Sequence, residues 1–259
     1  MPANNQRIRR MRRLARNAEV RESEGLFVVE GPRLVEEAIE ASLKIDEVIL
    51  PVDELDHDLI TVLGQEKIKF HLVQRKIFDG LTTLRNPQAA IASVHQHGLD
   101  LNSLVEKNGL LLILAGVSDP GNCGNLIRTA EAFGVSGILF HGGVDPYNPK
   151  VVRSSAGSFF RMRFAVLEEG FPYKTLFEEL KKSDYRSVAT SSSGGITPED
   201  VPSNSQIAVI LGNEPRGLPK EIEDLCDDIV TVPIENTVES LNVATAGAVV
   251  LYGIKRSLI

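Results

Sequence analysis

The chain has no tryptophan, two cysteines and few aromatic residues, and each shortage excludes a class of protein. Cys123 and Cys226 cannot build a disulfide framework or a four-ligand zinc site, so no metal centre of that kind is expected. Aromatic residues are 5% of the 259 residues, which argues against an aromatic cage as the recognition device. No run of 18 apolar residues exists, so we expect no membrane span. The scarcity of cysteine favours a reducing, cytoplasmic compartment.

Charge is plentiful but unevenly distributed. Hydrophobic residues at 42% and charged residues at 24% are typical of a globular protein, and the length suits one large or two modest domains. The net charge of −7 divides into +4 for residues 1–24 and −11 for residues 25–259. The apolar residues of the basic segment recur at helical spacing, which predicts an amphipathic helix or arm.

Three interpretations of this basic segment stay open. It is a solvated or domain-packing helix, an arm that contacts nucleic-acid phosphates, or a cleaved targeting peptide. The last is disfavoured because serine is scarce and the chain runs directly into a strand. The candidate phosphate contacts are Arg7, Arg9, Arg10, Arg12 and Arg13.

Two α/β domains follow the basic segment. Short apolar runs alternating with helix patterns predict a small domain over residues 25–95, then a polar linker at 96–108. The apolar run Leu110–Leu114 opens a second domain, residues 109–259, as a strand buried on both faces. We expect further strands at 137–140, 187–191, 207–211 and 229–232. Helices are expected at 122–133, 149–158, 173–182, 219–225 and 240–257. Strands separated by helices predict a parallel sheet with helices on both faces.

Ligands of such sheets bind beyond the carboxyl ends of the strands, so the loops there are the candidate site. The loop at 119–125 leads into a helix, where Asn122 is a candidate N-cap and Arg128 lies on the second turn. The loop matches neither the dinucleotide fingerprint nor the Walker loop, and Arg128 by itself reads as an ordinary salt-bridge residue.

Two later loops carry further polar residues. In the loop at 211–219, Gly212 permits close backbone approach, and Glu214 is either a functional carboxylate or a surface group. Before the last helix, Ser240 is a candidate N-cap. Asn242 is a polar group that needs partners beside the apolar stretch Val243–Leu251, which is suited to the core or to a subunit interface.

Together the three loops resemble the SpoU (TrmH) family of RNA 2′-O-ribose methyltransferases, within the SPOUT superfamily. The matching stretches are Asn122-x-Gly124-x-x-x-Arg128, then Leu211-Gly212-Asn213-Glu214-x-x-Gly217-Leu218, then Pro233 with Glu239-Ser240-Leu241-Asn242-Val243. The segment 152–158 resembles the stretch between the family's motifs, and residues 27–92 resemble its substrate-binding domain. Ile234, Asn236 and Ala89 depart from the residues usual in the family, and we expect activity to be kept.

The resemblance implies a C-terminal SPOUT domain with a deep trefoil knot, a homodimer and an S-adenosylmethionine (AdoMet) site. Gly212, Val232 and Leu241 would hold the cofactor. The implied catalytic group is Arg128, whose guanidinium would act as base, phosphate clamp or alkoxide stabiliser. Asn122, Glu214, Ser240 and Asn242 would position the hydroxyl and order the loops.

The expected activity is therefore AdoMet-dependent methylation of a ribose 2′-hydroxyl in RNA. A separate substrate-binding domain favours ribosomal RNA over transfer RNA. A non-catalytic RNA-binding protein on the same fold is disfavoured because all five candidate catalytic residues are present. A SPOUT enzyme that methylates a base is disfavoured by the Ser-Leu-Asn motif at 240–242.

Overall fold

A computed structural model describes residues 2, 5–106, 109–202, 206–235 and 237–257. The chain divides into two compact units, and each is described by itself. Unit 1 consists of Met1–His97 and Asp145–Arg161, and unit 2 consists of Gly98–Val144 and Met162–Ile259. The chain therefore passes between the units three times, whereas the sequence predicts a single linker.

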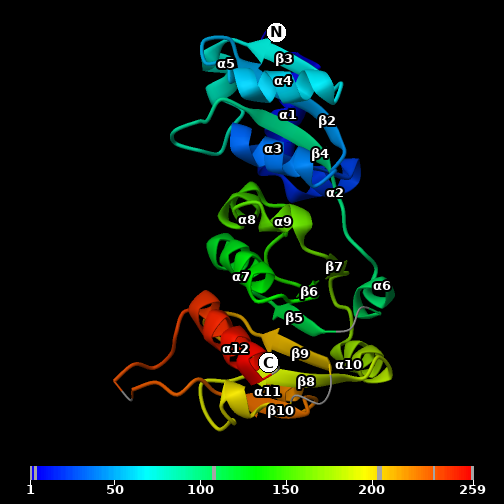
Figure 1. Cartoon of the computed structure of the whole chain (residues 1–259), viewed down its shortest axis with the longest axis vertical. Helices are drawn as coiled ribbons and strands as arrows, with labels where there is room; N and C mark the ends of the chain where they lie inside the picture. Colours follow the sequence, from blue (N-terminus) through cyan, green and yellow to red (C-terminus); the bar gives the residue numbers. More distant parts are fainter. Residues whose placement is uncertain (1, 3–4, 107–108, 203–205, 236, 258–259) are drawn as a thin grey trace. The chain divides into compact units, whose positions relative to one another are not determined.

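Unit 1 is a mixed four-stranded sheet with helices on both faces (Figure 1). The strand order is β1-β4-β2-β3; β4 is antiparallel to both β1 and β2, and β2 and β3 are parallel. Its strands are β1 (Leu26–Glu30), β2 (Ile45–Pro51), β3 (Phe70–Val73) and β4 (Ile91–His95). Its helices are α1 (Gln6–Arg16), α2 (Ala18–Glu24), α3 (Pro32–Glu40), α4 (His57–Gln65), α5 (Arg75–Asp79), α8 (Pro149–Ser154) and α9 (Ser158–Arg161).

The basic segment is part of this unit's core. Ile8, Met11, Leu14 and Ala15 of α1 are buried in one apolar cluster with residues of β1, β2, β3, β4 and α5. An amphipathic helix stabilises a fold by burying its apolar face. The domain-packing interpretation of residues 7–16 therefore describes this helix, and the expected boundary at residue 24 divides one hydrophobic core.

The segment 145–161 also packs in unit 1, although it follows β6 (Gly137–His141) in the chain. The rings of Phe27, His97, Tyr147 and Phe159 form one aromatic cluster, with centroids 5.2 to 6.4 Å apart. The Arg21 guanidinium, almost fully buried, pairs with Asp145 at 2.6 Å and donates to the Leu14 carbonyl at 2.8 Å. Such long-range contacts have no local sequence signal, which is why the sequence assigns this segment to the second domain.

Unit 2 is an all-parallel six-stranded sheet in the order β10-β8-β9-β5-β6-β7. Its strands are β5 (Leu110–Ala115), β6 (Gly137–His141), β7 (Phe164–Leu167), β8 (Tyr185–Thr190), β9 (Gln206–Leu211) and β10 (Asp228–Val230). Its helices are α6 (Leu101–Val105), α7 (Pro120–Ala132), α10 (Tyr173–Lys182), η1 (Pro198–Asp200), α11 (Lys220–Glu223) and α12 (Val243–Ser257). The predicted parallel sheet is confirmed; β7 was not predicted.

Helices cover both faces of this sheet, as the sequence predicts (Figure 1). Buried residues of α6, α10 and α11 share one apolar cluster with β5, β6, β8 and β9. Helices α7 and α12 pack against each other, and α12 also contacts β9. Within the described residues, no helix combines the length and the apolar character that a membrane crossing requires.

Candidate active site

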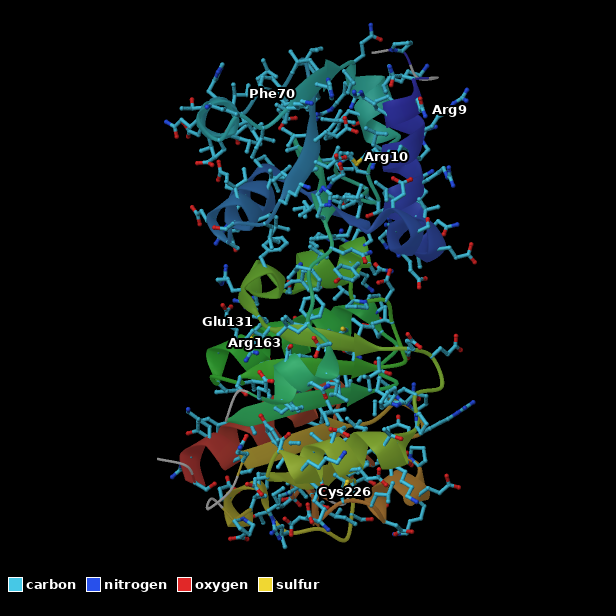
Figure 2. All side chains as sticks on the ribbon, turned by 90° about the vertical axis from the view of Figure 1, so that its right-hand side faces the viewer. Arg9, Arg10, Phe70, Glu131, Arg163 and Cys226 are labelled. Atoms are coloured by element: carbon cyan, nitrogen blue, oxygen red, sulfur yellow. The ribbon has the colours of Figure 1, made fainter. Side chains whose placement is uncertain are left out.

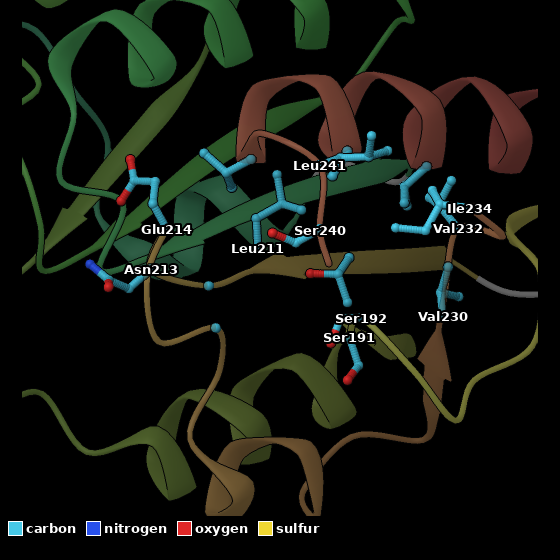
Figure 3. A pocket seen from close by; sticks show the side chains of 16 residues that line it. Ser191, Ser192, Leu211, Asn213, Glu214, Val230, Val232, Ile234, Ser240 and Leu241 are labelled. Atoms are coloured by element: carbon cyan, nitrogen blue, oxygen red, sulfur yellow. The ribbon is translucent and has the colours of Figure 1, made fainter. Parts of the chain in front are cut away.

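A pocket lies where the parallel strands β8, β9 and β10 end. Leu114 pairs with Leu211 and Thr190 pairs with Val230, so the loops that follow these strands are neighbours. The lining comes from those loops and from the start of α12: Thr190, Ser191, Ser192, Leu211, Gly212, Asn213, Glu214, Gly217, Val230, Val232, Ile234, Ser240, Leu241, Val243, Ala246 and Val250. In Figure 3, Asn213 and Glu214 lie at one end of the pocket, and Val232 and Ile234 lie at the other.

The loop after β9 is a tight turn that needs a glycine at its start. Gly217 N donates to the Asn213 carbonyl at 2.8 Å, and Asn213 Nδ2 donates to the Gly116 carbonyl at 2.9 Å. A Cβ on Gly212 would lie 2.5 Å from the carbonyl carbon of Gly217. Gly212 therefore allows the turn to fold back on itself, which is a structural reason in addition to its place in the pocket lining.

Glu214 joins the loop after β9 to the loop after β5. Its Oε2 accepts from Ser118 N at 3.1 Å and Ser118 Oγ at 2.9 Å, and its Oε1 accepts from Asp119 N at 3.0 Å. Partial burial opposes ionisation of this carboxyl, but the hydrogen bonds from Asp119, Asn122 and Ser118 outweigh it and lower its pKa to about 2. The carboxylate is thus ionised at neutral pH and holds two loops together.

A chain of side-chain hydrogen bonds connects all three predicted loops. Asn122 Nδ2 donates to Glu214 Oε1 at 3.2 Å, and Asn242 Nδ2 donates to Asn122 Oδ1 at 3.0 Å. These residues are 92 and 120 positions apart in the sequence, so only the fold brings them together. Because each amide presents both a donor and an acceptor, the chain fixes the orientation of both asparagines.

Two predicted helix caps are wrong. Asp119, rather than Asn122, is the N-cap of α7, since its carboxylate accepts from Asn122 N at 2.8 Å. The last helix begins at Val243, and Asn242, rather than Ser240, caps it by accepting from Ala244 N at 2.9 Å. Ser240 is exposed and lines the pocket, so its hydroxyl is available to a ligand.

Arg128 lies on α7 outside the pocket lining. Its side chain is exposed and has no hydrogen-bond or ion-pair partner among the described residues. It follows Asn122 by six positions, which places the two side chains on different faces of the helix. The structure therefore joins Asn122, Glu214 and Asn242 directly, places Ser240 nearby and leaves Arg128 apart from them.

Polar groups that the sequence analysis missed complete this edge of the sheet. They are Ser118 and Asp119 in the first loop, Thr190 at the end of β8, and Ser191 and Ser192 directly after it. Asp119 had a recognisable signal, because aspartate followed by proline is typical of an N-cap and the first helical residue. The others had none, since short stretches of serine and threonine carry no periodic pattern.

The five candidate phosphate contacts on α1 differ in their surroundings. Arg7 pairs with the buried Glu47 at 2.7 Å, and Arg10 pairs with Asp46 at 2.8 Å and also with Glu24. Arg12 Nε donates to the Gly80 carbonyl at 3.1 Å. Arg9 and Arg13 are exposed, and neither has a partner among the described residues. Figure 2 shows Arg9 and Arg10 pointing to different sides of the helix.

Comparison with known proteins decides the family. Residues 109–252 match the SpoU rRNA Methylase family, and residues 5–92 match the MRM3-like substrate binding domain. The chain belongs to the SpoU rRNA methylase family. The second match includes α1, in agreement with its burial in unit 1.

Family relatives resemble this chain over nearly its whole length. The 23S rRNA (guanosine(2553)-2′-O)-methyltransferase RlmP of Bacillus subtilis is 30% identical over 98% of this chain and 97% of its own. The SpoU methyltransferase AviRb of Streptomyces viridochromogenes, solved with AdoMet, has a TM-score of 0.89 and 25% identity over 98% of both chains. An AdoMet-bound rRNA methyltransferase from Sinorhizobium meliloti has a TM-score of 0.88 and 25% identity, over 100% of this chain and 97% of that one.

This SpoU-family chain is an AdoMet-dependent RNA 2′-O-ribose methyltransferase, and its pocket suits the cofactor by chemistry. The lining combines apolar walls, such as Leu211, Val232 and Leu241, with serine and threonine hydroxyls and the backbone of the turn after β9. That mixture is typical of small-molecule pockets. The departure Ile234 lines the pocket, whereas Asn236 lies outside the described residues.

The pocket is narrow in this structure. Its volume is about 130 Å³, below the roughly 300 Å³ at which pockets for whole small molecules begin. We therefore expect the walls formed by residues 230–234 and 240–250 to move apart when AdoMet binds. Within the described residues, no group of three His, Cys, Asp or Glu side chains could hold a metal ion.

Proposed function

We propose that this enzyme methylates a ribose 2′-hydroxyl of 23S ribosomal RNA at the pocket between β8, β9 and α12. The observation that carries the proposal is the hydrogen-bond chain Glu214–Asn122–Asn242, which brings the three family motifs together beside the pocket. RlmP is named for the same reaction on 23S rRNA, which supports that RNA as substrate.

The reaction needs a deprotonated hydroxyl aligned with the methyl group. AdoMet, when bound, supplies a methyl group already activated by its sulfonium. Ser240 and Asn242 then position the ribose, and Asn122 and Glu214 hold the loops that carry them. Gly212, Val232 and Leu241 belong to the cofactor-binding wall.

Arg128 is the proposed catalytic residue. Its exposed guanidinium is free of internal partners among the described residues, so it is available to RNA. It would clamp the phosphate next to the target ribose, stabilise the developing alkoxide, or remove the proton. The first two roles need only its positive charge, whereas a guanidinium pKa above about 12 makes proton removal demanding.

We infer that the enzyme is a homodimer through unit 2. Val249 and Tyr252 of α12 are exposed at 40% and 50%, and the Tyr252 ring lies 5.9 Å from that of Phe133. Apolar residues grouped in this way are typical of an interface. A dimer would also let Arg128 of one copy serve the pocket of the other. Sedimentation should give about twice the chain mass of 28.3 kDa.

Arg9 and Arg13 are the remaining candidates for RNA contacts on α1. The other three candidates, Arg7, Arg10 and Arg12, bind groups within unit 1. An exposed arginine without a partner contributes to phosphate binding at no cost in internal ion pairs. We also infer a cytoplasmic location, where a reducing compartment and ribosomal RNA coincide; fractionation of cells checks this.

A methyl-transfer assay tests the function. Purified enzyme, AdoMet with a labelled methyl group and unmodified 23S rRNA should give labelled RNA, and the labelled linkage should resist alkaline cleavage. Labelling of transfer RNA instead would identify transfer RNA as the substrate. An alkali-sensitive labelled linkage would indicate base methylation. Saturable AdoMet binding without labelling of either RNA would favour a non-catalytic binding protein.

A further inference from the structure

A polar groove lies at one edge of the unit 1 sheet, and its lining residues are distinct from those of the methyl-transfer pocket. Glu30 at the end of β1 and Ile49 near the end of β2 both pair with Ile91 at the start of β4. The turn after β1, the loop after β2 and the loop before β4 therefore meet. They enclose a groove of about 580 Å³ lined by Pro32, Glu54, Leu55, Asp56, Asn86, Pro87, Gln88 and Ala89.

The loop before β4 is held in place by the buried carboxylate of Glu30. Glu30, with 2% of its side chain exposed, accepts from Thr83 N at 2.8 Å and from Thr83 Oγ1 at 3.0 Å, and pairs with Arg153 at 3.2 Å. Gly31 has a φ of +105°, and a Cβ there would lie 2.2 Å from Gln88 Oε1. Such fixed loops form a rigid wall, and rigidity lowers the entropic cost of binding.

Arginines lie next to the lining residues of the groove, whereas carboxylates belong to the lining itself. Arg85, next to the lining residue Asn86, is exposed and has no partner among the described residues. Arg33, next to Pro32, is 89% exposed and pairs only locally, with Glu37 on the next turn of α3 at 3.2 Å. Each lining carboxylate is engaged through one of its two oxygens: Glu54 Oε2 pairs with Arg75 at 2.6 Å, and Asp56 Oδ1 caps α4.

This arrangement suits a nucleotide with an unstacked base. Two exposed guanidiniums beside the groove would bind backbone phosphates. Inside it, the carboxylates repel phosphate but accept hydrogen bonds from amino groups of bases, and Asn86 offers both a donor and an acceptor. Single-stranded RNA is recognised in this way, through splayed bases and their polar edges.

We propose that this groove binds an unpaired nucleotide of the RNA substrate, with its phosphates on Arg33 and Arg85 and its base against Asn86. The inference rests on the proposed function, because it gives the substrate RNA a second contact site in unit 1. The carboxylates further predict a preference for bases that carry an exocyclic amino group, so cytosine should bind better than uracil.

The test compares two double variants of the full-length enzyme for binding to unmodified 23S rRNA over a range of salt concentrations. Arg33→Gln/Arg85→Gln removes the two groove arginines. Lys44→Gln/Lys69→Gln removes two exposed lysines located at the start of β2 and β3, at the opposite edge of the same sheet. We expect the groove variant to raise Kd at least fivefold and to flatten the salt slope by about two. The lysine variant should stay within twofold of wild type.

A second arm tests the base contact. Asn86→Ala should weaken the binding of a cytidine 20-mer without changing its salt slope, and should reduce the preference of the wild type for that oligonucleotide over a uridine 20-mer. AdoMet affinity should be unchanged in every variant. The groove proposal would be refuted if the groove and lysine variants weakened RNA binding equally, or if the groove variant did not weaken it. A wild-type enzyme that neither binds nor methylates 23S rRNA would instead overturn the proposed function.

Discussion

Two glutamates, one in each unit, both hold a loop in place, but they differ in the charge of their partners. Glu214 of unit 2 and Glu30 of unit 1 each fix a loop at the edge of a sheet. Among the described residues, Glu214 accepts only from neutral N–H and O–H groups, whereas Glu30 also has the guanidinium of Arg153. Unit 2 therefore keeps an uncompensated negative charge beside its pocket, and unit 1 neutralises its own.

The difference indicates which of the two hydrogen-bond networks takes part in the reaction. A carboxylate held by converging neutral donors is rigid and still charged, so it attracts a cationic group. A buried carboxylate that already has a counter-ion gives rigidity alone. We expect substitutions in unit 2 to act on the reaction and substitutions in unit 1 to act on stability and RNA affinity.

Loss of Arg128 in unit 2 should have the largest effect. Arg128→Ala is expected to lower kcat about 10²–10⁴-fold, the range for removing a positioned catalytic group. AdoMet affinity and the melting temperature should stay at wild-type values, because Arg128 is exposed and without an internal partner. Arg128→Lys is the matched control: it restores much of the rate if a point charge suffices, and little if a bidentate contact is needed. A near-wild-type rate for the alanine variant would contradict the assignment.

Neutralising the glutamate of unit 2 should come next. Glu214→Gln keeps the shape but turns one acceptor into a donor that faces the N–H groups of Ser118 and Asp119. We expect kcat to fall roughly tenfold or more, since charged hydrogen bonds of about 1.5–3 kcal/mol are lost. Single-turnover assays at saturating AdoMet measure this effect. An unchanged kcat would mean that the loops are held by other contacts.

The same charge predicts a dependence of stability on pH. The pKa of Glu214 is lowered to about 2 in the folded enzyme, so ionisation stabilises the fold above the ordinary carboxyl pKa of about 4.3. This contribution should disappear as the pH falls from about 4.3 to about 2. Denaturant unfolding of wild type and Glu214→Gln should therefore differ at pH 6 and converge toward pH 2, and parallel curves would refute the assignment.

Neutralising the glutamate of unit 1 should affect stability rather than chemistry. Glu30→Gln leaves Arg153 with a weaker acceptor, and we expect the free energy of unfolding to fall by about 1–3 kcal/mol. A double-mutant cycle with Arg153→Met isolates the pair, because the two losses should not add. Here kcat at saturating RNA should stay within threefold of wild type. A kcat loss as large as that of Glu214→Gln would remove the distinction between the units.

The smallest effect is expected on the outer face of α1. Arg9→Gln/Arg13→Gln should weaken RNA binding severalfold and flatten its salt slope, without changing the melting temperature. Arg7→Gln/Arg10→Gln is the matched pair on the inner side and should lower the melting temperature, since the buried Glu47 loses both of its arginine partners and keeps only His71 among the described residues. The reverse pattern would show that the inner arginines are the RNA contacts.

Much of this protein could be predicted from local patterns. Alternating apolar runs predicted nearly every strand, because a strand buried on both faces is a continuous apolar segment, as at Leu110–Leu114. The three motif loops were predicted as one site, because parallel strands place their carboxyl ends together. Strand β7 was missed because only Phe164 and Ala165 are buried, whereas Val166 is exposed and Leu167 is partly buried, so the apolar signal is short.

Other features were decided by the tertiary structure alone. The sequence shows seven arginines before residue 22 but not which of them faces Glu47 or Asp46. Nor does it show that the segment 145–161 packs in unit 1, where Arg153 meets Glu30. The position of Glu214 between Ser118 and Asn122 likewise depends on the register of β5 and β9.

The sequence by itself thus determined the fold class, the family and the residue types of the site, because periodicity and spacing are local properties of a chain. Only the tertiary structure decided which charges are neutralised and which stay available. That outcome depends on contacts between residues about 40 to 120 positions apart, as in Arg7–Glu47 and Asn122–Asn242. The uncompensated carboxylate beside the pocket and the groove in unit 1 are both products of such contacts.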